Sequence, residues 1–329
     1  MAGNAVRIVR QVTLPLLALI AALSAGAQTA ATPAPAQPAP AAISAGTAAD
    51  APAPTIEVAA RLVAVSAVVR DKAGKPVSGL TRDDFVLKQD GKQQVITYFS
   101  QGSELPLTLA LMVDTSGSQH AYIQDEIAAG HAFFPSMMTR PDDRAVLVQF
   151  DDRVLQLATL TGNETTLEHA LAYLSQSHAD IGFAGRGGTL LFDAIGDVSR
   201  LELGNQMGRR AMVILTDGGD NGSRSSAKQA IEAAQRADIV IYTIYYSNGG
   251  GDEDVLRDLS KATGGREFAV GPKMTLAAIY AQIADDMRLE YEIGYAPPDT
   301  RPNKYHKIAV KAKDKALAVE AREGYFTPQ

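Results

Sequence analysis

The chain has 329 residues, 46% of them hydrophobic and 21% charged, which indicates a globular protein with one large domain or two modest ones. It has no cysteine, which excludes disulfides, thiolate zinc sites, thiol catalysis and a lipid-modified N-terminal cysteine. The formal net charge of −6 argues against a nucleic-acid partner, and the five histidines show no spacing typical of a zinc enzyme.

The N-terminus has the pattern of a targeting segment. Arg7 and Arg10 precede the apolar run 12–23, and Ala25-Gly26-Ala27 has the small-x-small form of a cleavage site. An uncleaved anchor is the alternative, but the run is short for a span of ~20 residues and a proline interrupts it. We therefore predict a cleaved signal peptide over 1–27, no stable membrane span after cleavage, and an exported protein, periplasmic or secreted.

Residues 28–55 are rich in alanine and proline. A segment of this composition buries too little apolar surface to fold, and its prolines favour extended polyproline II. We expect a linker between the membrane surface and the folded part of the chain.

Residues 56–100 have the pattern of a small β-rich module. The run 56–70 is strand-like, and Thr81 has the features of a helix N-cap. Asp90-Gly91 lies between two apolar runs, which is a strong hairpin signal.

The pattern changes at Leu105, where short apolar strands begin to alternate with amphipathic helices. The predicted strands are 107–113, 145–150, 211–216 and 239–244. The predicted helices lie near 121–138, 165–175, 190–201, 225–236, 253–262 and 275–289. Strands that are apolar on both faces and alternate with helices predict a doubly wound α/β fold with a mostly parallel sheet over 104–290. In such folds ligands bind at the carboxyl ends of the strands.

From 291 to 329 the chain returns to β character, with three short predicted strands at 291–295, 306–312 and 316–322. Neither flank has enough strand to be stable alone, since isolated hairpins are marginal. We therefore expect 56–100 and 291–329 to pair into one β-rich module beside the α/β domain.

Three segments bring oxygen atoms to the same predicted edge of the sheet. The first is D-T-S-G-S, with Asp114, Ser116 and Ser118; the second is G-G-T, with Thr189; the third is T-D-G, with Asp217. Two carboxylates and three hydroxyls suit a hard divalent cation, and they leave it electrophilic toward a further carboxylate. The alternative is that these side chains only cap helices, which explains one loop well but three loops poorly. We predict a site for Mg²⁺, or for Mn²⁺ or Ca²⁺.

These residues resemble a von Willebrand factor A domain with a metal-ion-dependent adhesion site. The D-x-S-x-S motif, the distal threonine and the distal aspartate of that family all have counterparts here, in the family's order. The resemblance implies that Ser116, Ser118 and Thr189 coordinate the ion directly. It also implies that Asp114 and Asp217 act largely through water.

The flanks resemble those of a bacterial, acidobacterial-type subgroup of exported proteins related to this family. The resemblance rests on the segment from Val68 to Phe85, on Y-x-x-G-Y-x-P at 291–297 and on A-R-x-G-Y at 321–325. It implies a location and an architecture but no particular partner.

The sequence therefore favours a binding protein over an enzyme. No nucleophile elbow, phosphate-binding loop or dinucleotide fingerprint occurs. We expect a bound cation to bridge to an Asp or Glu carboxylate of a partner protein. Two alternatives stay open, a Mg²⁺-dependent hydrolase and a structural envelope protein with a vestigial metal site. The oligomeric state is not predicted.

Overall fold

The computed structural model describes residues 62–102, 104–179, 188–246 and 251–328. The predicted signal peptide and the predicted linker lie outside the described residues. Within these ranges, no helix combines the length and the apolar character needed to cross a membrane.

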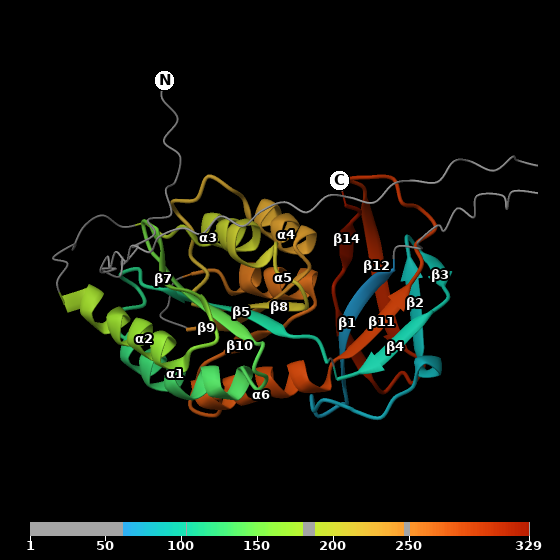
Figure 1. The fold of residues 1–329 in the computed structure, drawn as a ribbon, viewed down its shortest axis with the longest axis horizontal. Coiled ribbons are helices and arrows are strands. Elements are labelled where there is room, and N and C mark those ends of the chain that lie inside the picture. Colours follow the sequence, from blue (N-terminus) through green and yellow to red (C-terminus); the bar gives the residue numbers. More distant parts are fainter. Residues whose placement is uncertain (1–61, 103, 180–187, 247–250, 329) are drawn as a thin grey trace, which may run out of the picture. The chain divides into compact units, whose positions relative to one another are not determined.

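Six of the described strands form the central sheet of the α/β domain (residues 104–290), in the order β10-β9-β8-β5-β6-β7 (Figure 1). Their bounds are β5 Leu107–Asp114, β6 Arg144–Phe150, β7 Val154–Thr161, β8 Arg209–Thr216, β9 Ile239–Tyr245 and β10 Glu267–Ala269. All neighbours pair in parallel except β6 and β7, which are antiparallel. The predicted doubly wound, mostly parallel sheet is thus confirmed.

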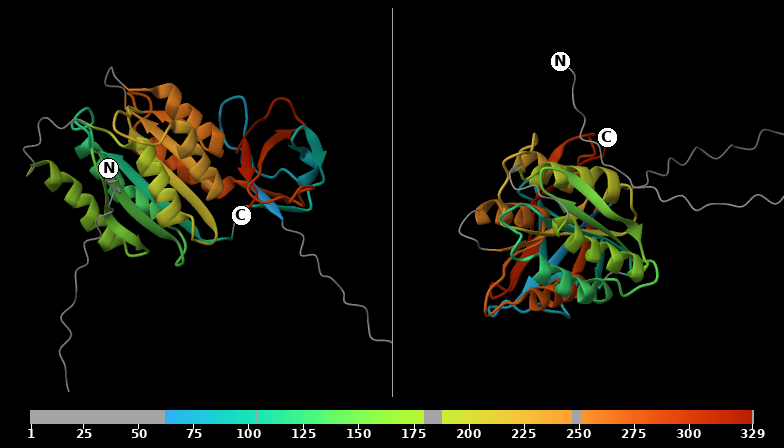
Figure 2. Two further views of the ribbon diagram at one scale, coloured as in Figure 1. Left: turned by 90° about the horizontal axis from the view of Figure 1, so that it is seen from above. Right: turned by 90° about the vertical axis from the view of Figure 1, so that its left-hand side faces the viewer.

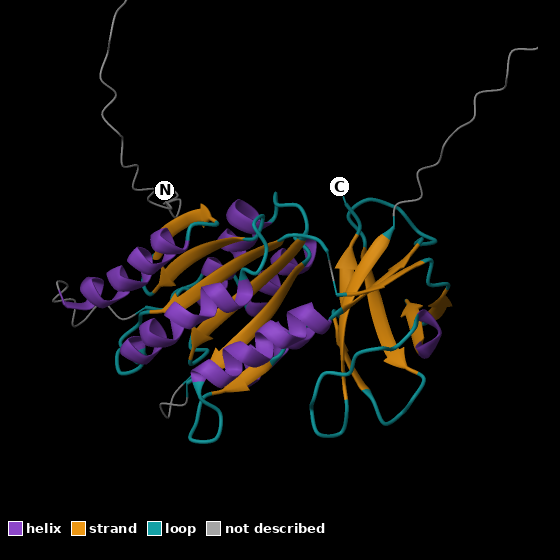
Figure 3. Ribbon diagram, turned by 60° about the horizontal axis from the view of Figure 1, so that its bottom comes forward, coloured by secondary structure: helices purple, strands orange, loops and turns teal. Residues whose placement is uncertain are grey.

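Helices cover both faces of this sheet (Figure 3). One core contains residues of α1, α2 and α6, and a second core on the other face contains residues of α3, α4 and α5. The bounds are α1 Ile123–Met137, α2 Glu164–Ala179, α3 Leu191–Asp197, α4 Ala227–Arg236, α5 Glu253–Thr263 and α6 Leu276–Leu289. Every residue of β5 is buried, as a strand covered on both faces requires.

Local signals set most of the helix boundaries. Ser226 begins α4 with a reciprocal capping box, and the Asp252 side chain caps α5 by accepting from the Val255 N–H. The predicted helix 190–201 is shorter than expected, because α3 ends at Asp197 and continues as a π-helical turn, Val198–Leu203. A π-helical turn has i→i+5 hydrogen bonds, which the apolar periodicity of the sequence does not distinguish from those of an α-helix.

Two strands of the central sheet were not predicted. β7 is an edge strand with most residues only partly buried, so it lacks the continuous apolar run that identified the others. β10 has three residues and pairs only through its parallel contact with β9. Each of these edge strands is defined by its pairing with one neighbouring strand, β6 for β7 and β9 for β10. The local sequence does not show this pairing.

The flanks form the β-module (residues 62–101 and 291–328), whose described strands make two four-stranded sheets (Figure 2). One sheet has the order β13-β1-β11-β4 and the other β14-β12-β2-β3. The bounds are β1 Val63–Arg70, β2 Phe85–Gln89, β3 Lys92–Gln94, β4 Tyr98–Gln101, β11 Tyr291–Tyr295, β12 Tyr305–Ala312, β13 Ala318–Ala321 and β14 Gly324–Phe326. Strands from both flanks pair within each sheet and share one core, so the predicted joint module is confirmed.

The module differs from expectation in detail. The predicted hairpin at Asp90-Gly91 joins β2 to β3, but the apolar run that follows divides, and β4 belongs to the other sheet. Thr81 begins a single 3₁₀ turn, Arg82–Asp84, and Asp84 completes its capping box. The short strand β14 was not predicted. A strand that changes sheets has no distinct local pattern, because alternation continues across the break.

Candidate metal centre

The two predicted aspartates lie at the point where the winding of the sheet reverses. From β5 the chain runs outward to β6 and β7, and it then returns to the other side of β5 as β8. Asp114 is the last residue of β5, and Asp217 follows directly after β8, the neighbouring parallel strand. Crevices at the carboxyl ends of strands beside such a reversal are the usual ligand sites of doubly wound folds.

Asp114 is fully buried, and both of its carboxylate oxygens accept hydrogen bonds. Oδ1 accepts from the Ser116 N–H at 2.9 Å, and Oδ2 accepts from the Thr216 hydroxyl at 2.6 Å. Burial is the main cause that raises the pKa of Asp114 to about 6; the bonds from Ser116 and Thr216 oppose the rise, and the charge of Asp217 adds to it. The site therefore holds two carboxylates whose mutual repulsion a cation would relieve.

The hydroxyls of the first loop point toward each other. The Ser116 and Ser118 hydroxyl oxygens are 3.2 Å apart. At Mg–O distances of ~2.1 Å, two neighbouring ligands of an octahedral ion lie ~3 Å apart. The two serines thus have the spacing that a shared cation requires, and the donor set is entirely oxygen, which suits Mg²⁺ and similar hard ions.

Asp217 is held by tight packing of its own loop. Its Oδ1 accepts from the Gly219 N–H at 2.9 Å, and its carbonyl accepts from the Asp252 N–H at 2.9 Å. Gly218 has φ +81°, and a Cβ there would lie 2.4 Å from the Asp252 carbonyl oxygen. At Gly251, with φ +84°, a Cβ would lie 2.0 Å from the Asp217 carbonyl oxygen. Glycine at both positions allows this close approach.

Thr189 lies two residues before the first residue of α3 and is 7% exposed. Its backbone N–H donates to the Asn221 side chain at 2.7 Å, which ties it to the loop that follows Asp217. The next residue, Leu190, donates its N–H to the Asp151 carbonyl at 2.9 Å, which ties it to the loop after β6. The structure therefore joins the segment that carries Thr189 to the same edge of the sheet as the two aspartates.

Sequence reasoning missed several polar residues around the site. Glu126, in the first turn of α1, is 2% exposed, and neither of its carboxylate oxygens has a hydrogen-bond partner among the described residues. Burial, then the charges of Asp114 and Asp125, raise the pKa of Glu126 well above its usual range. Asp151 accepts from the Thr115 hydroxyl at 3.3 Å. An acidic residue in a first helical turn is usually a solvated cap, so no local signal marks Glu126 as buried.

Among the described residues, no group of three or more histidine, aspartate or glutamate side chains could hold a metal ion. The predicted site is of another kind, since it has two carboxylates and relies on hydroxyls for its other ligands. A site of this kind is identified by the order of its motifs and their positions at strand ends, and not by a cluster of charged side chains.

The central part of the chain matches a known protein family. Residues 109–219 match the family model described as "von Willebrand factor type A domain". This segment contains all five predicted site residues and is similar to that family. No curated protein matches the chain.

Several solved structures resemble parts of the chain at low identity. BatB from Bacteroides thetaiotaomicron is 15% identical, over 55% of this chain and 97% of that chain, with a TM-score of 0.45. A von Willebrand factor type A protein from Catenulispora acidiphila is 13% identical, over 73% of each chain, with a TM-score of 0.46. Proximal thread matrix protein 1 from the mussel byssus, with a zinc-occupied MIDAS motif, is 15% identical over 60% of this chain and 49% of that chain, with a TM-score of 0.47. Because these similarities are weak, the function of this chain is inferred from its own residues.

Proposed function

We propose that the chain is an exported, metal-dependent protein-binding module. In this proposal a divalent cation is held by Asp114, Ser116, Ser118, Thr189 and Asp217, and it takes an Asp or Glu carboxylate of a partner protein as a further ligand. The observation that carries it is the convergence of two like-charged carboxylates and a pair of hydroxyls at the carboxyl ends of β5 and β8.

The proposed roles follow from charge and from hydrogen bonding. Asp114 and Asp217 supply two negative charges, which neutralise a divalent cation without making the site anionic. The serine and threonine hydroxyls add oxygen ligands without charge, so the cation, when bound, would attract a partner carboxylate. Thr216 and the Ser116 N–H orient Asp114 through their hydrogen bonds, as outer partners of metal ligands commonly do.

Metal binding is the first test. Mg²⁺, Mn²⁺ and Ca²⁺ are each titrated into the protein, and the melting temperature and the binding heat are measured. A ligand that binds only the native state stabilises it by RT ln(1 + [L]/Kd), about 2.7 kcal/mol at a hundredfold excess over Kd. We expect at least one of the three ions to raise the melting temperature and EDTA to reverse the rise. No response to any of them would indicate a vestigial site in a structural protein.

Partner capture is the second test. The protein is used as bait in an envelope extract, with Mg²⁺ or with EDTA, beside the variant Asp217→Ala. We expect a partner that is retained only by the wild type with metal, and whose capture is lost when a surface Asp or Glu of the partner is replaced. Capture that survives EDTA would separate partner binding from the ion. Turnover of a phosphodiester or peptide substrate that Asp217→Ala abolishes would favour the hydrolase instead.

Export is proposed from the N-terminal sequence. The apolar run 12–23 and the motif Ala25-Gly26-Ala27 support cleavage after residue 27. N-terminal sequencing of protein recovered from cell fractions should find Gln28, or a residue near it, as the first residue. Recovery of an intact Met1 on membrane-bound protein would instead indicate a retained anchor.

A further inference from the structure

The N-terminus of α3 is capped by side chains from a different loop. Leu190 at its N-cap makes no side-chain cap hydrogen bond. Instead, the Phe192 N–H donates to Asp220 Oδ2 at 3.0 Å, and the Asp193 N–H donates to the Ser223 hydroxyl at 3.0 Å. The backbone N–H groups at the start of a helix have no partner within the helix, so a cap supplied in trans also joins the two segments.

The bonding between the two segments is reciprocal. The Asp193 side chain accepts from the Arg224 N–H at 3.0 Å through Oδ2 and from the Ser225 N–H at 2.9 Å through Oδ1. Each segment therefore satisfies backbone groups of the other, with side chains as the acceptors. We call residues 189–193 and 220–225 together the polar clasp.

Asn221 is the part of the polar clasp that acts on the predicted metal ligand. Its side-chain oxygen accepts from the Thr189 N–H at 2.7 Å. In return, the Thr189 carbonyl accepts from the Asn221 N–H at 3.3 Å and from the Gly222 N–H at 3.2 Å. Both ends of the Thr189 residue are thus held by the loop that begins with Asp217, the other distal member of the predicted site.

We propose that Asn221 is a positioning residue that sets the Thr189 hydroxyl for the metal ion and couples it to Asp217. This inference rests on the function proposed above. A metal site built from separate loops binds more tightly when each ligand is already in place before the ion binds. Otherwise the conformational entropy lost in ordering the loop reduces the free energy of metal binding. Asn221 supplies that placement through the backbone, without contributing a ligand.

An amide at this position has a further consequence for charge. Its oxygen accepts the Thr189 N–H as a carboxylate would, but it adds no negative charge beside Asp114 and Asp217. A third carboxylate would neutralise the cation further and weaken its attraction for a partner carboxylate. Asparagine therefore positions Thr189 while the site stays electrophilic.

The test is a double-mutant cycle between Asn221→Ala and Thr189→Ala, read out as Mn²⁺ affinity by water-proton relaxation. Loss of a partner that orients a ligand typically costs ~10- to 100-fold in metal affinity. We expect Asn221→Ala to weaken binding by at least ~10-fold in the wild-type background and by less than ~3-fold in the Thr189→Ala background. The effect disappears there because Asn221 acts through the Thr189 hydroxyl.

Asn163→Ala is the matched control. The Asn163 side chain also accepts a backbone N–H, that of Thr166 at 3.1 Å, at the start of α2. The Asn163→Ala variant should have a lower melting temperature than the wild type in EDTA, and its Mn²⁺ affinity should be unchanged. Asn221→Asp keeps the acceptor for the Thr189 N–H in a nearly isosteric side chain, so it should fold and bind Mn²⁺ at least as tightly as the wild type.

Three results would overturn the inference. One is an unchanged Mn²⁺ affinity in Asn221→Ala. Another is an equal loss in both backgrounds, which would make Asn221 independent of Thr189. The third is a weakening in Asn221→Asp that equals that in Asn221→Ala. These outcomes are distinct from failure of the proposed function, in which the wild type itself binds no Mn²⁺.

Discussion

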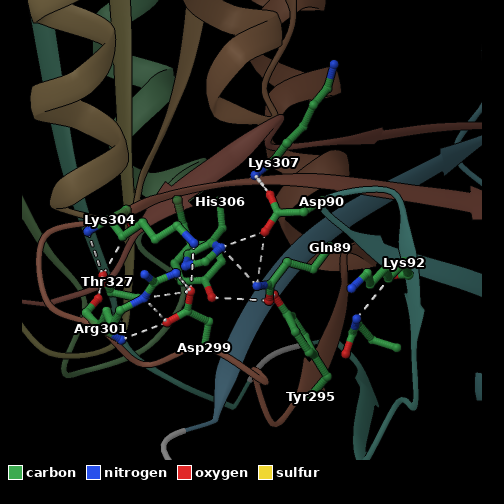
Figure 4. Close-up of polar contacts among 12 residues, drawn as sticks. Gln89, Asp90, Lys92, Tyr295, Asp299, Arg301, Lys304, His306, Lys307 and Thr327 are labelled. Atoms are coloured by element: carbon green, nitrogen blue, oxygen red, sulfur yellow. Dashed lines mark hydrogen bonds and ion pairs between the residues drawn. The ribbon is translucent and has the colours of Figure 1, made fainter.

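Asp114 of the α/β domain and Asp299 of the β-module lie in opposite electrostatic surroundings. At the strand ends of the α/β domain, burial and the like charge of Asp217 raise the pKa of Asp114 to about 6, and uncharged donors hold its oxygens. In the β-module, Arg301 and Lys304 surround Asp299, at 2.7 and 2.6 Å, and lower its pKa well below the usual range (Figure 4).

Other polar groups of the β-module also pair with one another. Asp90 accepts from the Lys307 N–H at 2.9 Å and lies 2.7 Å from His306 Nδ1. The Tyr295 hydroxyl donates to the Gln89 side chain at 2.7 Å (Figure 4). A dense polar cluster is therefore not by itself a candidate ligand site. The like charges of Asp114 and Asp217 distinguish the metal centre from a cluster that stabilises the fold.

The largest expected effect is a loss of stability when a buried carboxylate loses its positively charged partner. Arg70 of β1 contacts Asp286 of α6 at 2.5 Å and Glu320 at 2.8 Å, and the Asp286 side chain is 0% exposed. Arg70→Met leaves a buried carboxylate without its partner, which typically costs 3–5 kcal/mol, so we expect roughly that loss in the free energy of unfolding. Urea denaturation measures it, and the affinity for Mg²⁺ should not change.

Arg257→Met is the control for this prediction. Arg257 also contacts two carboxylates, Glu253 at 2.7 Å and Asp254 at 2.6 Å, but its side chain is 50% exposed. Its replacement should cost less than about 1 kcal/mol, as for other exposed pairs. If the two variants lost the same stability, burial would not be what gives the Arg70 pair its effect.

The second effect concerns the like-charged pair Asp114 and Asp217. Asp217→Ala removes half of the carboxylate charge of the metal centre, so the stabilisation by Mg²⁺, about 2.7 kcal/mol at a hundredfold excess over Kd, should be lost. Without metal the variant should melt at or above the wild-type temperature, because Asp114 no longer faces a like charge. Asp258→Ala, at an exposed position of α5, should keep the full response to Mg²⁺. A full response in Asp217→Ala would place the ion elsewhere.

The third effect is a dependence on pH. Burial raises the pKa of Glu290 from 4.5 to about 7, although Arg209 at 3.1 Å opposes the rise. Because the folded state then binds more protons than the unfolded state between these values, stability should fall as the pH rises from about 4.5 to about 7. Glu290→Gln should reduce that fall by at most roughly 2 kcal/mol between pH 5 and 7. Urea denaturation across this range measures it, and an identical pH profile in wild type and variant would contradict the prediction.

The smallest effect is expected at the metal loop itself. Ser118→Ala removes a neutral ligand that water replaces in part, so the rise in melting temperature with Mg²⁺ should shrink but persist. A parallel measurement on Asp114→Ala should show no rise at all. Equal losses in the two variants would mean that the hydroxyl matters as much as the charge.

The sequence by itself determined most of the helices and strands and the positions of the motifs. Apolar strands that alternate with amphipathic helices predict the doubly wound sheet, and turn chemistry places Asp114 and Asp217 at strand ends. D-T-S-G-S sets Ser116 and Ser118 at alternate positions of one turn, which brings their hydroxyls together. These features follow from local periodicity and local turns, and such information lies within a few residues of the chain.

The tertiary structure alone decided what surrounds these residues. The antiparallel edge strand β7, the burial of Glu126 and the hydrogen bond from Thr189 to Asn221 all depend on segments that are distant in sequence or packed from another element. The raised pKa of Asp114 likewise arises from burial and from a residue 103 positions further along the chain. Burial and long-range hydrogen bonds are properties of the packed molecule, so no local pattern encodes them.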